Sequence, residues 1–240
     1  MAEEFEGRDL SAAVFWGVDL RGAQFRDVDM TDVAISHARI VNVDIDGLVD
    51  HVTINGVDVT QYVNERDSWY PLRAMVRPSD IAGMQAAWKA LEQTWAGTID
   101  RAQRLSEAQV HESVGGEWSF VETLRHLLFA MDKWFTVPIL DQAFHPIGLP
   151  NTGSADFGWP GLDRDADPPL REALGVRAER SAKLQDYLDK LRPEDLVRTV
   201  DVLENGPNPV QECLYTVFEE EFEHNRYATR DLAHFEPAAR

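Results

Sequence analysis

Residues 8–47 read RDLSA AVFWG VDLRG AQFRD VDMTD VAISH ARIVN VDIDG, which is eight consecutive blocks of five residues. The third residue of every block is apolar: Leu10, Phe15, Leu20, Phe25, Met30, Ile35, Ile40 and Ile45. From the second block onward the first residue is small or β-branched: Ala13, Val18, Ala23, Val28, Val33, Ala38 and Val43. A helix repeats every 3.6 residues and a flat strand every two, so a strict period of five belongs to neither. The segment is therefore predicted to be a repeat structure.

This register resembles the pentapeptide-repeat family. The resemblance implies a right-handed quadrilateral β-helix, with one block on each side and the first and third residues of a block facing inward. At four blocks to a coil, the segment would make about two coils, and a solenoid that short buries little core of its own. The dipeptide Asn55-Gly56, flanked by Val52-Thr53-Ile54 and Val57-Asp58-Val59, predicts a two-residue β-hairpin that would cap the open end.

After Tyr62 the apolar residues follow a helical period, and four helices are predicted. Their expected spans are about 80–105, 119–138, 168–192 and 209–233. The predicted start signals are Ser79 as N-cap, the capping box of Ser119 and Glu122, Pro168 in a first turn, and Asn208 as N-cap. A Gly/Pro-rich connection from Phe144 to Pro169 could be either a functional lid or a plain crossover. Two domains are expected, residues 1–62 and residues 63–240, in a mainly α chain.

The last predicted helix carries a candidate pair of metal ligands. Glu220 and His224 lie four residues apart, on a face that begins with Cys213 and Val217. A carboxylate and an imidazole at this spacing can bind one ion from a single helix. His126, in the middle of the second predicted helix, is the candidate third ligand. The alternatives are that these histidines are ordinary core residues, or that Glu221 is the carboxylate ligand.

A His, Glu, His set suits Zn²⁺, Ni²⁺, Fe²⁺ or Mn²⁺, with zinc the most frequent choice. Three protein ligands leave a coordination position for water or substrate, which is the arrangement of catalytic sites. Two other residues are near in sequence. Glu122 could support His126 or simply cap its helix, and Arg226 could bind an anionic substrate or pair with the acidic residues around it.

The segment Glu117-Trp-Ser-Phe-Val-Glu-Thr-Leu-Arg-His-Leu, together with Glu220-Glu-Phe-Glu-His-Asn-Arg-Tyr, resembles the DinB-like family of metal-binding four-helix bundles. The resemblance covers roughly residues 80–235, and His126 and His224 match the ligand pattern of the family. The first ligand of the last helix is often histidine there and is Glu220 here. The mycothiol-dependent maleylpyruvate isomerases, a branch of the same superfamily, are similar in using His, Glu and His.

The resemblance implies a metal-dependent thiol S-transferase or isomerase. The metal would bind a low-molecular-weight thiol such as mycothiol or bacillithiol and hold the thiolate for attack on a small electrophile. It also implies a homodimer. The alternative is a non-enzymatic interaction protein that acts through its pentapeptide-repeat surface.

The composition of the chain argues against several kinds of partner, site and location. The formal net charge of −19 argues against nucleic acid as a partner. The single cysteine, Cys213, excludes an intramolecular disulfide and a cysteine-based zinc cluster. No stretch approaches the roughly 18 apolar residues of a membrane span, and the acidic start is unlike a signal peptide. A cytoplasmic bacterial protein that does not enter a membrane is expected.

Overall fold

The computed structural model describes residues 4–5, 7–26, 28–151, 158–159 and 161–236. The chain divides into two compact units, Met1–Asp46 and Gly47–Arg240. The hairpin that was expected to accompany the repeats thus belongs to the second unit, while the expected domain boundary at residue 62 stays a prediction. No described helix offers the long apolar stretch that crossing a lipid bilayer would require.

The backbone of the first unit turns at a regular interval of five residues. The last residues of six blocks have left-handed backbone angles: Ala12, Gly17, Gly22, Asp32, His37 and Asn42. Alternate corners are closed by hydrogen bonds, such as the 3.0 Å bond from the Ala13 amide to the Leu10 carbonyl. At the same corner the Ser11 amide donates to Asp9 Oδ1 at 2.9 Å. The five-residue period of the sequence is therefore also the period of the backbone.

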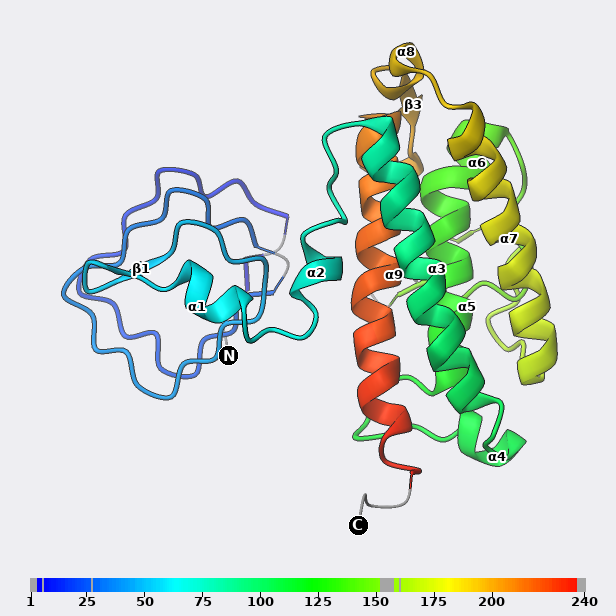
Figure 1. Ribbon diagram of the computed structural model, residues 1–240, viewed down its shortest axis with the longest axis horizontal. Helices are drawn as coiled ribbons and strands as arrows, with labels where there is room; N and C mark the ends of the chain where they lie inside the picture. The colour runs from blue at the N-terminus through cyan, green and yellow to red at the C-terminus, as the bar shows by residue number, and fades with distance from the viewer. Residues whose placement is uncertain (1–3, 6, 27, 152–157, 160, 237–240) are drawn as a thin grey trace. The chain divides into compact units, whose positions relative to one another are not determined.

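The third residues of the blocks are not buried. Their exposed fractions range from 44% at Leu10 to 75% at Ile45, although an inward-facing row was expected to form a small core. A segment of only eight blocks leaves these side chains few neighbouring blocks to pack against. The described residues of the unit also form no regular strand, as its winding trace in Figure 1 illustrates.

The predicted hairpin is confirmed. Strands β1 (Thr53–Ile54) and β2 (Val57–Asp58) pair antiparallel, with Thr53 opposite Asp58. Between them Asn55 and Gly56 both have positive φ, 52° and 79°, which is the conformation that a type I′ turn requires. Two short helices follow, α1 (Thr60–Asn64) and α2 (Tyr70–Arg73).

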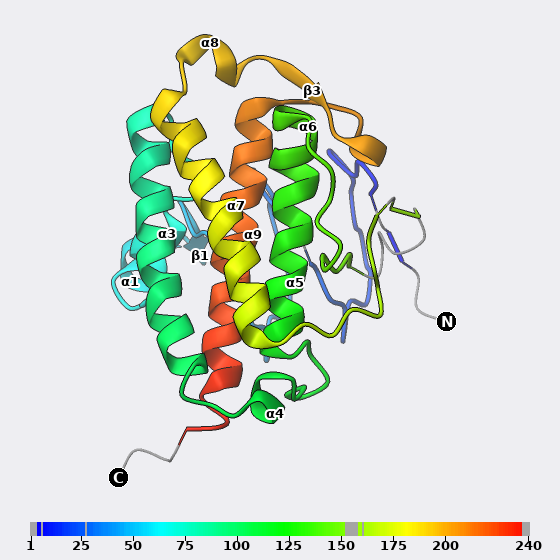
Figure 2. The ribbon, with the colours of Figure 1, turned by 90° about the vertical axis from the view of Figure 1, so that its right-hand side faces the viewer.

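The rest of the second unit is mainly helical. Its long helices are α3 (Ile81–Ala102), α5 (Phe120–Met131), α7 (Leu170–Lys190) and α9 (Val210–Leu232). Helix α9 contacts α3 and α5, and α7 contacts the same two helices from the other side, so the four lie side by side (Figures 1 and 2). Large apolar side chains that are fully buried fill the space between them: Trp88, Trp95, Leu124, Leu184 and Phe218 among others. This arrangement brings α5 and α9, which carry the candidate ligands, into direct contact.

Shorter elements complete the unit. Helix α4 (Glu107–Val110) precedes α5, and α8 (Pro193–Leu196) follows α7. Helix α5 continues through a π-helical segment, η1 (Asp132–Thr136), into α6 (Val137–Leu140). Strands β3 (Thr199–Asp201) and β4 (Pro207–Pro209) form an antiparallel hairpin around the 3₁₀ turn Leu203–Asn205, and β4 leads directly into α9.

Two of the predicted helix caps are wrong by one residue. The first long helix is capped by Asp80, whose Oδ1 accepts the Gly83 amide at 2.7 Å, and not by Ser79. Asp80 has the extended backbone that an N-cap needs, whereas Gly83 packs close to Pro78 and fixes the turn one residue later than expected. Asn208 is not a cap either, because it pairs with Val200 in the hairpin and leaves the N-cap position to Pro209.

Of the other two predicted helix starts, that of α5 is confirmed and that of α7 is not. The capping box of α5 is confirmed: Glu122 accepts the Ser119 amide at 2.8 Å, and the Ser119 hydroxyl accepts the Glu122 amide at 3.2 Å. Helix α7 begins at Leu170, two residues beyond the expected Pro168. Its first amide donates to Glu107 of α4 at 2.7 Å, so a distant side chain fixes this helix start.

Candidate metal centre

Helices α5 and α9 bring His126, Glu220 and His224 together. One ligand atom from each of these residues lies within 4.8 Å of the other two. His126 Nε2 is 3.4 Å from Glu220 Oε2, and His224 Nδ1 is 3.3 Å from the same oxygen. The His126 side chain is 6% exposed and that of Glu220 is 30% exposed, so the cluster is partly buried and reachable from the carboxylate side.

The hydrogen bonds of the two imidazoles fix which nitrogen can bind a metal. His126 Nδ1 lies 3.1 Å from the carbonyl of Leu149, and His224 Nδ1 lies 2.9 Å from the carbonyl of Glu220. A carbonyl only accepts, so each Nδ1 must carry the proton and donate it. In the neutral ring the lone pair is then on Nε2, which is the nitrogen left for coordination.

In the neutral ring the electron pair of His126 Nε2 would face a carboxylate oxygen of Glu220. A lone pair and a carboxylate at 3.4 Å repel each other unless a proton or a metal cation lies between them. Burial alone would raise the pKa of Glu220, but a proton on His126 Nε2 that is donated to the carboxylate, together with positive charge on His126, His224 and Lys133, lowers it. Glu220 is thus suited to face a cation, whether a proton on the imidazole or a metal ion. The carboxylate is therefore ionised at neutral pH.

His224 is neutral at neutral pH. Burial, followed by the charge of His126, lowers its pKa below the ordinary value, and these effects outweigh the attraction of Glu220. Metal binding requires an unprotonated imidazole, so the surroundings of this ring favour a ligand over a proton. The donor set and its protonation thus fit a divalent cation.

Aromatic rings surround the two imidazoles. The Trp118 ring centroid is 4.5 Å from that of His126 and 6.2 Å from that of His224. Phe129 lies 6.2 Å from His126, and Tyr227 lies 6.0 Å from His224. These rings hold the imidazoles in place and limit the access of water, which strengthens electrostatic interactions at the centre.

Glu221, the alternative ligand, lies outside the cluster. Its side chain is 3% exposed and accepts a hydrogen bond from Arg177 Nη2 at 2.8 Å, while the same nitrogen contacts Glu92 at 2.8 Å. Burial raises the pKa of Glu221 despite the neighbouring guanidinium. Glu221 therefore belongs to an ion-pair network between α3, α7 and α9.

The other sequence candidates have structural partners. Glu122 closes the capping box of α5. Arg226 Nη1 donates to Glu223 at 2.6 Å, the pairing with acidic neighbours that was one of its two readings. Cys213 is fully buried in the apolar core, where desolvation raises the pKa of its thiol to about 11 and leaves it unreactive.

Two contributors to the centre were not foreseen. The Leu149 carbonyl comes from the long connection between α6 and α7, and a backbone acceptor carries no sequence signal. Trp118 lies just before the capping serine of α5, eight residues from His126, and its ring contact with that imidazole depends on the fold of the segment before the helix.

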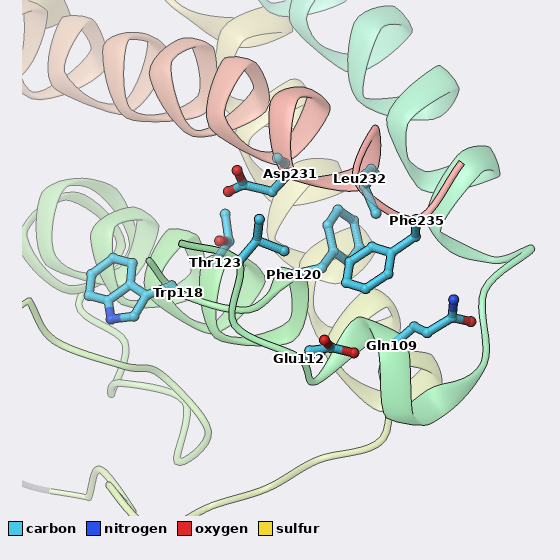
Figure 3. Close-up of a pocket in the computed structure, with 10 residues that line it drawn as sticks. Gln109, Glu112, Trp118, Phe120, Thr123, Asp231, Leu232 and Phe235 are labelled. Atoms are coloured by element: carbon cyan, nitrogen blue, oxygen red, sulfur yellow. The ribbon is translucent and has the colours of Figure 1, made fainter. Parts of the chain in front are cut away.

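A small hollow lies beyond Trp118, at the ends of α5 and α9. Figure 3 shows Phe120, Leu232 and Phe235 gathered at one end of it and Trp118 at the other. It encloses about 10 Å³, room for about one water molecule, so it is too small to hold a substrate.

Comparison with family models gives two matches. The model of pentapeptide repeats matches residues 9–47 in eight copies. The model of the DinB superfamily matches residues 90–228, more than half of the chain, and this range contains all three residues of the cluster. Comparisons with curated proteins and with solved structures gave no match. The chain therefore belongs to the DinB superfamily and carries a segment of pentapeptide repeats before its DinB domain.

Proposed function

We propose that this protein binds one divalent metal ion through His126, Glu220 and His224, within a four-helix bundle formed by α3, α5, α7 and α9. The observation that supports this most directly is that His126 Nε2, the ring nitrogen not bonded to the Leu149 carbonyl, faces the Glu220 carboxylate at 3.4 Å. A divalent cation between nitrogen and oxygen would be attracted to both. Zinc is the metal that we propose, with nickel, iron and manganese as the alternatives that the same donors accept.

Metal analysis of purified protein tests the site. We expect the wild-type chain to carry one equivalent of a divalent ion, and His126→Ala and Glu220→Ala to lose it. Glu219→Ala is the matched control, because Glu219 is the neighbouring carboxylate on α9 and pairs with Arg77 outside the cluster. Full metal retention in both ligand variants would refute the assignment.

We further propose that the activity is transfer of a low-molecular-weight thiol, mycothiol or bacillithiol, to a small electrophile, or a thiol-dependent isomerisation. A bound divalent ion lowers the pKa of a coordinated thiol and holds the thiolate for attack. The chain supports this chemistry with three ligands, which leave a position for the thiol, and with the exposed side of Glu220, from which the thiol would approach. Trp118 and Phe129 would keep water away from the thiolate.

Conjugation of monochlorobimane tests the activity. The metal-loaded protein should accelerate the reaction of the bimane with mycothiol or bacillithiol, and the rate should fall to the uncatalysed level in Glu220→Ala. Absence of acceleration with both thiols would remove the support for a transferase while leaving the metal site intact.

A second candidate function is protein binding through the repeats. The exposed apolar third residues from Leu10 to Ile45 are the observation that favours it, because exposed apolar side chains gathered in one segment offer a surface that a partner could cover. Replacing Phe15 and Phe25 with serine should then weaken association with a partner, or with a second copy of the chain, without changing metal content. Unchanged association behaviour in sedimentation experiments would count against this role.

A further inference from the structure

A buried arginine next to His126 holds the α6–α7 connection against α5. The Arg125 side chain, on a residue only 6% exposed, donates from Nε to the Ile147 carbonyl at 2.9 Å. Its Nη2 donates to the carbonyls of Asp163 and Arg164 at 3.3 Å and 3.2 Å. One guanidinium therefore fastens two stretches of the connection that lie far apart in sequence.

The same connection reaches the metal centre through Leu149. The Leu149 amide donates to the carbonyl of Arg125 at 3.0 Å, and the Leu149 carbonyl accepts the bond from His126 Nδ1 at 3.1 Å. Leu149 is two residues from Ile147, the residue that Arg125 Nε holds. The position of the acceptor for His126 thus depends on how firmly this stretch is fastened to α5.

The two fastened stretches also support each other. The Asp163 amide donates to the carbonyl of Pro146 at 2.8 Å. The carbonyls that Arg125 binds therefore come from two stretches of the connection that are joined by a hydrogen bond of their own. The planar guanidinium can donate to both stretches at once. A lysine in this place would offer a single ammonium group and could not hold the same set of carbonyls.

We propose that Arg125 is a positioning residue of the metal centre, which clamps the connection so that the Leu149 carbonyl stays at His126 Nδ1 and Nε2 remains the metal-binding nitrogen. The inference rests on the proposed metal-binding function. Without the clamp the carbonyl moves away, and the neutral imidazole takes up both tautomers and a wider range of orientations. Loss of a hydrogen bond that orients a ligand typically weakens metal binding about 10- to 100-fold.

The full-length chain with Arg125→Met tests the inference, because methionine fills similar space without a donor. Two quantities are measured: zinc affinity by competition with a chelator, and the tautomer of His126 by ¹⁵N NMR in metal-free protein. We expect zinc affinity to fall about 10- to 100-fold. We also expect the signal of the Nδ1-protonated ring, dominant in the wild type, to become a mixture of both tautomers.

A matched control separates positioning from general loss of stability. Leu184→Ala removes a fully buried side chain from α7, in a part of the core that does not include His126. It should lower the melting temperature while leaving zinc affinity and the His126 tautomer unchanged. Arg125→Lys should lie between wild type and Arg125→Met in both quantities, and it decides the question alone if the methionine variant does not fold.

Wild-type affinity together with a wild-type tautomer in the Arg125 variants would overturn the proposal. So would an equal loss of affinity in Leu184→Ala, because the effect would then follow stability alone. If the wild-type chain binds no zinc, the proposed function fails, whereas the NMR comparison in metal-free protein still decides the role of Arg125.

Discussion

Glu220 and Glu221 are consecutive residues with opposite surroundings. Glu220 faces two imidazoles, and the pKa of its carboxyl group is lowered. Glu221 is buried against Arg177, and the pKa of its carboxyl group is raised. Consecutive residues of a helix point about 100° apart, so only one of the two can face α5. The face that begins at Cys213 and Val217 already selects Glu220.

The two carboxylates should therefore respond differently to substitution. We expect Glu221→Gln to keep the metal and to lower the free energy of unfolding by about 1–3 kcal/mol, because a buried charge-assisted hydrogen bond is weakened. Arg177 retains Glu92 as a partner in that variant. Metal content and urea unfolding of the same preparation give both values. Loss of metal in Glu221→Gln, with retention in Glu220→Ala, would reverse the assignment.

The stability of the metal-free protein should depend on pH through His224. Its pKa in the folded chain lies below the ordinary value of about 6.5, to which it returns on unfolding. As the pH falls through about 6.5, the unfolded chain takes up the proton first, so acidification lowers the free energy of unfolding.

Urea unfolding between about pH 7.5 and about pH 5.5 measures this slope. Glutamine cannot take up the proton, so His224→Gln should show a smaller decrease over the same interval. An identical decrease in both proteins would assign the pH dependence to other groups.

The sequence was enough to predict the side chains of the candidate metal centre, but not the backbone groups that contact them. Helical spacing was enough to pair Glu220 with His224, whereas the choice of His126 depended on the resemblance to DinB proteins. Asp80 was missed as a cap because Ser79 and Asp80 are both good capping residues, and the extended backbone and the bond from the Gly83 amide that distinguish Asp80 arise only in the folded chain. The Leu149 carbonyl could not be predicted, since every residue has a carbonyl.

Among the elements, the π-helical segment η1 is held by one carboxylate. Asp132 is fully buried, and its Oδ1 accepts from Arg180 Nε at 2.8 Å. Its Oδ2 accepts the amide of His145 at 2.7 Å, and the hydroxyl of Thr136 donates to Oδ1 as well. The carboxylate thus joins η1, α7 and the start of the α6–α7 connection.

Removing this carboxylate should destabilise the whole second unit. Among the residues that the structure describes, Asp132→Ala leaves the buried guanidinium of Arg180 with the exposed Glu179 as its partner, and we expect a loss of about 3–5 kcal/mol in the free energy of unfolding. Denaturant unfolding measures it, and Asp100→Ala, at an exposed position on α3, is the control that should change little. A loss below about 1 kcal/mol would mean that water replaces the missing partners.

The elements themselves were predictable to different degrees. The four long helices were expected from apolar spacing, and the capping box fixed the start of α5 to the residue. Helix α7 started later than expected because Glu107, from a separate helix, receives its first amide. The segment η1 has no sequence signal, because an extra residue in a helical turn is set by tertiary contacts such as those of Asp132.

For the whole molecule, metal binding should stabilise the folded state. A ligand that binds only the folded chain adds about 2.7 kcal/mol to its stability at a free concentration of 100 times Kd. Adding a chelator to metal-loaded protein should therefore lower the melting temperature. The melting temperature of His126→Ala should be the same with and without the chelator. A wild-type melting temperature that ignores the chelator would contradict a metal bound to the folded state.

The division of the chain into a repeat segment and a helical segment was visible in the sequence, because the two periods of five and 3.6 residues are easy to separate. Both family assignments agree with it. The small core of the repeat segment was expected, since eight blocks imply only about two coils and so short a repeat structure buries little of its surface. The structure goes further, because each of the eight third residues is at least 44% exposed.

The left-handed corners of the first unit restrict how its length can change during evolution. Each corner falls on the last residue of a block, so inserting or deleting a single residue shifts every later corner onto the wrong position. Gain or loss of a whole block keeps them all in place. Related chains should therefore differ in this segment by multiples of five residues, while the hairpin loop at Asn55-Gly56 keeps a constant length.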